Sequence, residues 1–196
     1  LGFYGGGGID SRCPSDGTPI SSADWAGPPD VPRWGEDYKK TLREVFTHGA
    51  AFVGHTTSLP LPTNSVSLDP ALRDRWGRPA LRTTYKDHPD DLSTVKFFRE
   101  RSEELMQAAG AIKTWGETSG DLSPTSQHLL GTCRMGNNPE SSVVDKFHRA
   151  HDVPNLFICD GSSLVTSGRG QPTMTIQALA FRAAEHMASA ARRGEI

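Results

Sequence analysis

Three stretches of the chain repeat apolar residues at the three- and four-residue spacing of an amphipathic helix. The first covers residues 35–46 and places acidic residues before basic ones, which suits a short surface helix. The second opens at Asp90 and ends at Gly110, a residue type common at helix C-termini. The third begins at Pro172 and ends before Gly194. The positions predicted to share a face are Tyr38, Leu42 and Val45; Leu92, Val95, Phe98, Ser102, Leu105 and Ala109; and Ile176, Leu179, Ala180, Ala183, Ala184, Met187, Ala190 and Ala191.

Between and after these helices, β-branched and alternating residues predict strands. Residues 45–57, 64–68 and 79–85 indicate an antiparallel sheet of at least three strands. Residues 143–145 and 156–160 indicate two further short strands. The second of these is a continuous apolar run, which is typical of a sheet covered on both faces.

The glycine run Gly5 to Gly8 lies within a segment rich in turn-forming residues. We therefore expect turns and irregular coil over the first 33 residues. A phosphate-binding loop is the functional alternative, but it needs a strand before the glycines and a helix after them, and the sequence predicts neither. Together with the helices and strands, this pattern predicts a mixed α/β (α+β) fold in two regions that meet near residue 122.

Composition narrows the classes of partner. Lys and Arg number 21 against 23 Asp and Glu, a net charge of -2 over 196 residues, and no basic stripe is visible. Nucleic acid and anionic membrane surfaces are therefore poor candidates as partners.

We expect no membrane span and see no targeting segment, so a soluble chain in the cytoplasm or the periplasm is expected. The length suffices for a core. The three cysteines, Cys13, Cys133 and Cys159, fit neither a disulfide framework nor a metal site.

Two polar constellations could carry chemistry. His128 opens the segment His-Leu-Leu-Gly-Thr-Cys-Arg-Met-Gly, and histidine is the side chain best suited to take a proton near neutral pH, although a structural histidine is the alternative. Asp160 and Gly161 follow the predicted strand 156–160, and Gly168 to Thr173 lead into the last helix. Strand ends and helix N-termini are common sites for anionic or electron-rich ligands. The alternative is that these glycines only allow two tight turns, without a ligand site.

The remaining candidates are weaker. His148 and His151 have a spacing compatible with metal ligation, but their neighbours favour an exposed turn. Serine catalysis lacks its Gly-x-Ser-x-Gly motif. Trp76, Trp115 and Phe98 lack the interleaved basic residues of a nucleic-acid groove, so we expect them in the core.

The stretch from His128 to Arg182 resembles the C-terminal signature of the glucose-methanol-choline (GMC) flavoprotein oxidoreductases. Four motifs occur in the order and at the spacing of that family. They are His-Leu-Leu-Gly-Thr-Cys-Arg-Met-Gly (128–136), Ser-Val-Val-Asp (142–145), Val-Pro-Asn-Leu-Phe-Ile-Cys-Asp-Gly-Ser (153–162) and Gln-Pro-Thr-Met-Thr-Ile-Gln-Ala-Leu-Ala (171–180). Asn-Ser-Val-Ser-Leu-Asp (64–69) and Asp-Arg-Trp-Gly-Arg-Pro (74–79) resemble the family's substrate domain with lower specificity.

The resemblance implies FAD-dependent oxidation of an alcohol, often a sugar or polyol, with hydride passing to flavin N5. His128 matches the family's catalytic histidine and would accept the hydroxyl proton. Gln171 departs from the family, which usually has a second histidine or an asparagine there. An amide can hydrogen-bond the substrate oxygen but cannot act as a base, so Gln171 would position the substrate.

The resemblance also implies a cofactor site and a domain division. Asp160 and Gly161 would lie along the ribityl and phosphate region of FAD, and the turn Gln171-Pro172-Thr173 would approach the flavin pyrimidine edge. Residues 1–122 would belong to the substrate domain with its antiparallel sheet. Residues 123–196 would form the C-terminal part of the flavin domain.

One element of the family is missing from the sequence. No strand-Gly-x-Gly-x-x-Gly-helix is present, and Gly168-Arg169-Gly170 has no third glycine at Thr173. We therefore expect a fragment or one of two chains, which needs a polypeptide carrying the nucleotide-binding half. A non-catalytic remnant or interaction module with the same fold is the alternative. The particular alcohol and the electron acceptor stay open.

Overall fold

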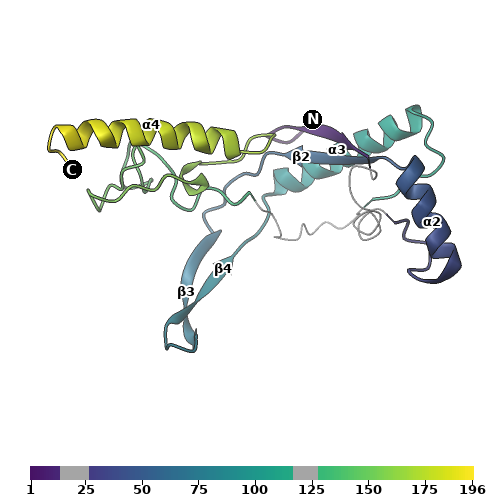
Figure 1. Ribbon diagram of the computed structural model, residues 1–196, viewed down its shortest axis with the longest axis horizontal. Coiled ribbons are helices and arrows are strands. Elements are labelled where there is room, and N and C mark those ends of the chain that lie inside the picture. Colours follow the sequence, from purple (N-terminus) through teal and green to yellow (C-terminus); the bar gives the residue numbers. More distant parts are fainter. Residues whose placement is uncertain (14–26, 117–127) are drawn as a thin grey trace.

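The computed structural model describes residues 1–13, 27–116 and 128–196, and it is a mixed α/β structure with small antiparallel sheets (Figure 1). The expected domain boundary near residue 122 lies outside the described residues. The elements in chain order are β1 (Gly7–Arg12), α2 (Gly35–His48), β2 (Ala51–Thr56), β3 (Ser65–Arg73), β4 (Pro79–Thr84), α3 (Pro89–Ala108), the short 3-10 helix η2 (Gly161–Ser163) and α4 (Thr173–Arg192).

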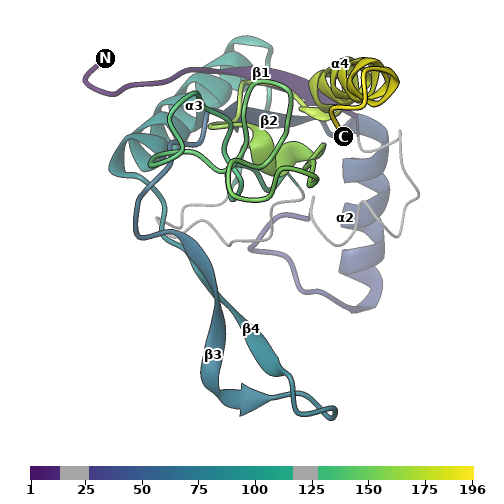
Figure 2. The ribbon, with the colours of Figure 1, turned by 90° about the vertical axis from the view of Figure 1, so that its left-hand side faces the viewer.

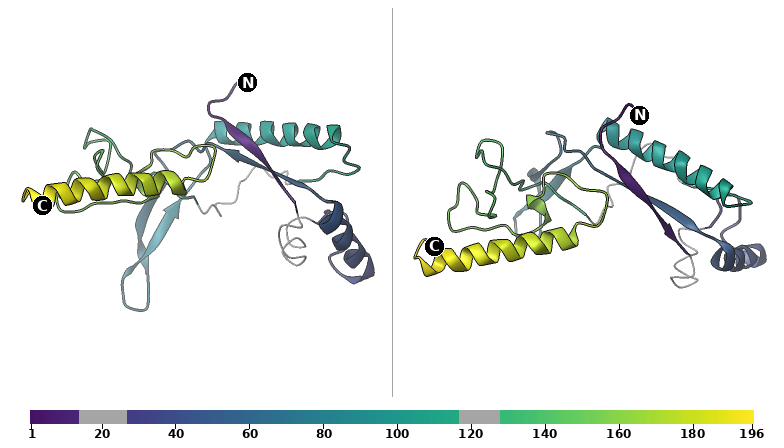
Figure 3. Two further views of the ribbon diagram at one scale, coloured as in Figure 1. Left: turned by 45° about the horizontal axis from the view of Figure 1, so that its top comes forward. Right: turned by 90° about the horizontal axis from the view of Figure 1, so that it is seen from above.

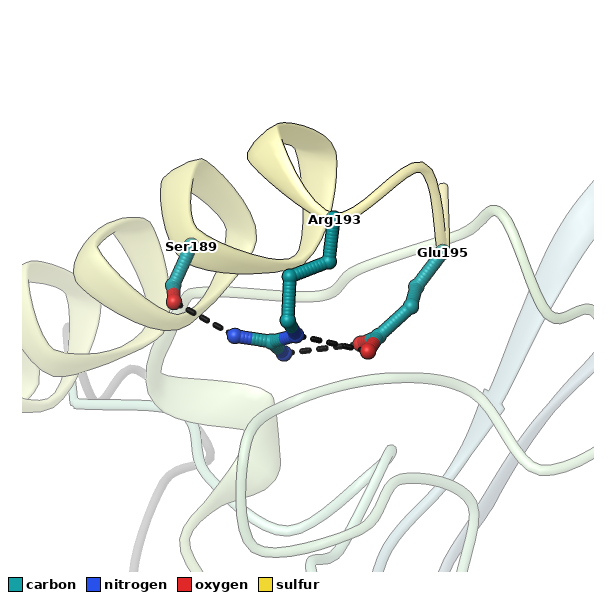
Figure 4. A network of polar contacts seen from close by, with 3 residues as sticks. All are labelled: Ser189, Arg193 and Glu195. Atoms are coloured by element: carbon teal, nitrogen blue, oxygen red, sulfur yellow. Dashed lines mark hydrogen bonds and ion pairs between the residues drawn. The ribbon is translucent and has the colours of Figure 1, made fainter.

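All three predicted helices are confirmed as α2, α3 and α4. The helix α3 starts where Pro89 occupies the first turn and the His88 side chain accepts a hydrogen bond from the Asp90 N–H. Its predicted stripe is only partly covered, since Leu105 is exposed. The helix α4 ends in a polar network, because Arg193 donates to both carboxylate oxygens of Glu195 and to the Ser189 hydroxyl (Figure 4).

The expected three-stranded sheet is wrong, because the strand after α2 pairs with the glycine-rich N-terminal segment. β1 and β2 form one antiparallel pair, in register from Gly7 opposite Thr56 to Arg12 opposite Ala51, and β3 and β4 form another. The strand expected from residue 45 begins only at Ala51, since α2 continues to His48. The coil expected over the first 33 residues is wrong over residues 7–12.

The glycines of β1 and β2 are explained by what packs on them. A side chain at Gly7 would come within 2.7 Å of the Phe98 ring, and one at Gly54 within 3.2 Å of Phe98 Cβ. These glycines let α3 lie directly against the β1–β2 pair (Figure 3). Phe98 therefore packs on the sheet as predicted, but it is half-buried and lies outside the small core.

The β3–β4 hairpin projects away from the rest of the chain (Figure 2). Val66 pairs with Thr83 and Leu68 with Leu81, so one face of the hairpin is largely apolar, and it is exposed. At its tip Trp76 is 67% exposed, with the Arg75 guanidinium stacked on it. Trp115 is also 38% exposed. The expectation that both tryptophans lie in the core is wrong, since Trp76 lies at the tip of the projecting hairpin and Trp115 is also exposed.

The C-terminal third forms loops under α4 in place of the expected doubly covered sheet. Residues 143–145 and 156–160 pair only through isolated bridges, Val144 with Met135 and Ala150, and Arg149 with Phe157. Their backbone groups bond within the loops instead. The ring of Phe147 stacks on His186 of α4 with the ring centroids 3.9 Å apart.

The core of the described residues is small. Its buried apolar side chains are Val45, Val144, Ala150, Ala183 and Ala190. The accessible surface of the chain is 13913 Å², about 1.5 times the roughly 9,100 Å² that a compact monomer of its mass exposes. The chain is long enough for a core, but it leaves much of its apolar surface uncovered. The helices of the described part are all too short or too polar to cross a membrane.

Candidate functional site

Three segments from the predicted site meet at Gly161. A Cβ at this position would lie 2.8 Å from Leu130 Cδ2, 3.0 Å from Ile176 Cδ1 and 3.5 Å from the Leu129 carbonyl oxygen. Leu129 and Leu130 directly follow His128, and Ile176 lies in the first turn of α4. The absence of a side chain at Gly161 therefore lets the His128 loop, η2 and the start of α4 come together.

Backbone hydrogen bonds hold the His128 loop against η2. The Cys133 N–H donates to the Ser162 carbonyl at 2.9 Å, and the Met135 N–H donates to the Ser163 carbonyl at 2.8 Å. Gly131 has a positive φ of 87° and lies against the carbonyls of Leu164 and Val165. The imidazole of His128 is exposed at the start of this loop.

Asp160 lies at the N-terminus of η2, where the sequence predicted the end of a buried strand. Its Oδ1 accepts hydrogen bonds from the Ser162 N–H and the Ser162 hydroxyl. These bonds hold the pKa of the Asp160 carboxyl below its usual range, so the group is ionised at neutral pH. Burial and the Asp160 charge raise the pKa of the neighbouring Cys159 thiol, which favours its protonated, unreactive form.

The turn that leads into α4 presents exposed polar groups. Gln171 and Thr173 are exposed, and the Pro172 carbonyl accepts the Ile176 N–H at 2.9 Å. No side chain caps the N-terminus of α4. Its first N–H groups and the positive end of its dipole are therefore directed at whatever lies before the helix.

His148 and His151 have structural positions, so the expected exposed turn is wrong for them. His148 is 1% exposed, has a φ of 67°, and places Nδ1 2.8 Å from the Ile158 carbonyl. His151 Nε2 lies 3.0 Å from the Ser142 hydroxyl and 3.2 Å from the Gly136 carbonyl. Across residues 1–13, 27–116 and 128–196, no group of three His, Cys, Asp or Glu side chains could hold a metal ion.

Sequence reasoning placed Arg169 in a candidate segment but missed the contact that it makes. Arg169, two positions before Gln171, lies over Gly8 of β1 and pairs with Asp10. The signal was a lone arginine between two glycines. Nothing local in the sequence indicates its distant partner.

The fold and the junction at Gly161 place the four sequence motifs in one connected structure, and the comparison with protein families agrees. The family model described as GMC oxidoreductase matches residues 60–180. The chain belongs to the GMC oxidoreductase family.

Curated relatives match over most of the chain. It is 43% identical over 157 residues to 2-methyl-1,2-propanediol dehydrogenase of Mycolicibacterium austroafricanum, covering 80% of this chain and 28% of the relative. It is 37% identical to 6'''-hydroxyparomomycin C oxidase of Streptomyces lividus, covering 77% and 28%. It is 29% identical to the fructose dehydrogenase large subunit of Gluconobacter japonicus, covering 82% and 29%. The chain therefore spans less than a third of the length of these relatives.

Proposed function

We propose that the chain is the C-terminal part of an FAD-dependent oxidoreductase that converts a CH–OH group of an alcohol, sugar or polyol to a carbonyl. The observation that carries the proposal is the junction at Gly161, where the His128 loop, the Asp160 turn and the start of α4 meet. The names of the relatives, two dehydrogenases and an oxidase, support chemistry at a hydroxyl group.

His128 is the group that takes the proton. As the C–H electron pair leaves the carbinol carbon, the imidazole accepts the hydroxyl proton, so no free alkoxide forms and a carbonyl results. FAD, when bound, supplies the acceptor of that hydride. The Gln171 amide donates a hydrogen bond to the substrate oxygen and orients it toward His128.

The groups around the junction fit a flavin in two respects. The ionised carboxylate of Asp160 accepts hydrogen bonds and repels phosphate, so it suits the ribityl hydroxyls better than the pyrophosphate. The uncapped start of α4, with Gln171, Pro172 and Thr173, suits the electron-rich pyrimidine edge. Gly161 contributes by close packing, since its Cβ position is already taken by Leu130 and Ile176.

The site needs a second structural part that carries the nucleotide-binding glycine motif. Two observations support this partner: the accessible surface is about 1.5 times that of a compact monomer, and the chain spans 28% of the propanediol dehydrogenase. We call the chain together with this half the complete oxidoreductase. An exposed, mainly apolar patch on α4, made of Gln177, Ala180, Phe181 and Ala184, is our candidate contact surface for it.

The first test of the function is a visible spectrum with an intact mass of the purified protein. Flavin absorption, a second polypeptide or a longer chain, and anaerobic bleaching by an alcohol or sugar are the expected results. A colourless 21.2 kDa species that binds no partner half would contradict the proposal. A colourless species that binds another protein would instead favour the interaction module.

Replacing Phe181 by Glu is expected to weaken the contact with the nucleotide-binding half. Phe181 is 75% exposed in the chain and would be buried in that contact, where a charge in place of an aromatic ring costs about 2 kcal/mol or more. The measurement is FAD bound per chain after gel filtration. The control is Lys96→Glu, a charge change at an exposed position of α3, away from this patch. Equal flavin content in both variants would refute this contact surface.

A further inference from the structure

The β1–β2 pair is covered on both faces, and glycines make this possible on each. Neighbouring residues of a strand point to opposite faces. Gly7 faces Phe98 of α3, whereas Gly8 faces the other side, where a Cβ would overlap the Arg169 guanidinium and come within 2.7 Å of its Cζ. The guanidinium therefore lies directly on the strand backbone.

Asp10 lies on the same face of β1 as Gly8 and holds this guanidinium. Its Oδ1 accepts a hydrogen bond from the terminal nitrogen of Arg169 at 3.0 Å. Its Oδ2 lies 3.2 Å from Nε2 of His55, which pairs with Gly8 in the register of the sheet. Arg169 and His55 thus approach different oxygens of one carboxylate.

Two further contacts tie the segment before α4 to Ser58, two residues after the end of β2. The Ser58 N–H donates to the Ser167 hydroxyl at 2.9 Å, and the Thr166 hydroxyl donates to the Ser58 carbonyl. Within residues 166–169, the Arg169 side chain is therefore bonded to β1, and the side chains of Thr166 and Ser167 are bonded to Ser58. The loop before α4 reaches this sheet in Figure 1.

This loop joins the two halves of the candidate site. The loop begins after Ser163, the buried last residue of η2, and continues to Gln171, which is two residues after Arg169. The position of Gln171 thus depends on where residues 166–169 are held. An exposed ion pair adds little to the free energy of folding. We therefore expect the Asp10–Arg169 pair to affect the position of the loop more than the stability of the chain.

We propose that Asp10 is a positioning residue: by holding Arg169 across Gly8, it fixes the loop that presents Gln171 to the substrate. The contacts of Arg169, Ser167 and Thr166 support the anchoring of this loop. The consequence for catalysis rests on the proposed function.

Hydrogen exchange tests the anchor without reference to activity. In the complete oxidoreductase, Asp10→Asn is expected to raise amide exchange over residues 164–171 about 1.5- to 5-fold, the factor that corresponds to an exposed ion pair. Gly8→Ala is the second variant, since it displaces Arg169 and leaves every charge in place. The pair Asp10→Arg with Arg169→Asp restores the opposite charges and is expected to restore part of the protection.

The control is Glu36→Gln, which removes an exposed ion pair to Lys40 on α2 at a similar distance of 3.0 Å. We expect it to leave exchange in the loop unchanged. Unchanged exchange in both Asp10→Asn and Gly8→Ala would overturn the anchor.

The catalytic consequence has its own readout. Asp10→Asn is expected to lower kcat/KM for the alcohol about tenfold, with an unchanged thermal midpoint and partial recovery in the charge-reversed pair. Faster exchange with unchanged kcat/KM would overturn the positioning role. A wild-type protein that binds no flavin would refute the proposed function, while the exchange data would still decide the anchor.

Discussion

Replacing His128 by Gln is expected to slow reduction of the flavin by substrate about 10²- to 10⁴-fold in the complete oxidoreductase, because a positioned general base contributes a factor of this size. Glutamine keeps a polar side chain on the exposed start of the loop but cannot accept a proton near neutral pH. Anaerobic stopped-flow mixing, followed at the visible flavin bands, measures this step directly. Bound flavin per protein is measured on the same samples, so a loss of cofactor is not mistaken for a loss of chemistry.

The matched control is His48→Gln, which changes another exposed histidine at the end of α2. We expect it to leave the rate of flavin reduction within about twofold, since surface changes away from a site have small effects. A wild-type rate in His128→Gln, with full flavin content, would refute the assignment of His128 as base. The proton acceptor would then have to come from another group.

Replacing Gly161 by Val is expected to have the second largest effect, on both stability and catalysis. The Cβ alone would press against Leu130 and Ile176, and the two extra methyl groups overfill the junction, at a cost of about 1–3 kcal/mol. Because Leu130 is two residues from His128, the His128 loop must move to relieve the overlap. The free energy of unfolding, measured by chemical denaturation, and the rate of flavin reduction should therefore both decrease.

A compensating variant separates packing from other causes. Leu130→Ala removes the Cδ2 atom that the new side chain meets, so the double variant should recover part of the stability lost in Gly161→Val. Gly6→Val is the control, because a Cβ at Gly6 has no atom within 4 Å and its φ is not positive. If Gly161→Val matches this control in stability and rate, the junction does not hold the site together.

Local pattern was enough to predict the helices, because each repeats apolar residues over several turns and carries recognisable end signals. It was not enough for the sheets. The glycines of β1 give no strand signal, and their role depends on Phe98 and Arg169, which lie far away in the chain. The apolar run at 156–160 has the composition of a strand, but the predicted strand is wrong. A strand also needs neighbours to pair with, and only one bridge forms there.

For the candidate site, too, the sequence predicted the local motifs but not the contacts between distant segments. Its motifs were visible in the sequence, and the family they indicated is confirmed by the match over residues 60–180. The closeness of Leu130, Gly161 and Ile176 could not be predicted, since it depends on packing between three separate segments. The pairing of Asp10 with Arg169 spans 159 positions and has no local signature. The roles of His128, Gln171 and Asp160 remain predictions for the experiments above.

The β3–β4 hairpin has a consequence for how this chain behaves during expression. Both of its strands have an unpaired edge within the described residues, and the face bearing Val66, Leu68 and Leu81 is exposed. Open edges beside an apolar face are templates for strand addition from other molecules, which leads to aggregation. We therefore expect the isolated chain to aggregate through this hairpin when it is expressed alone.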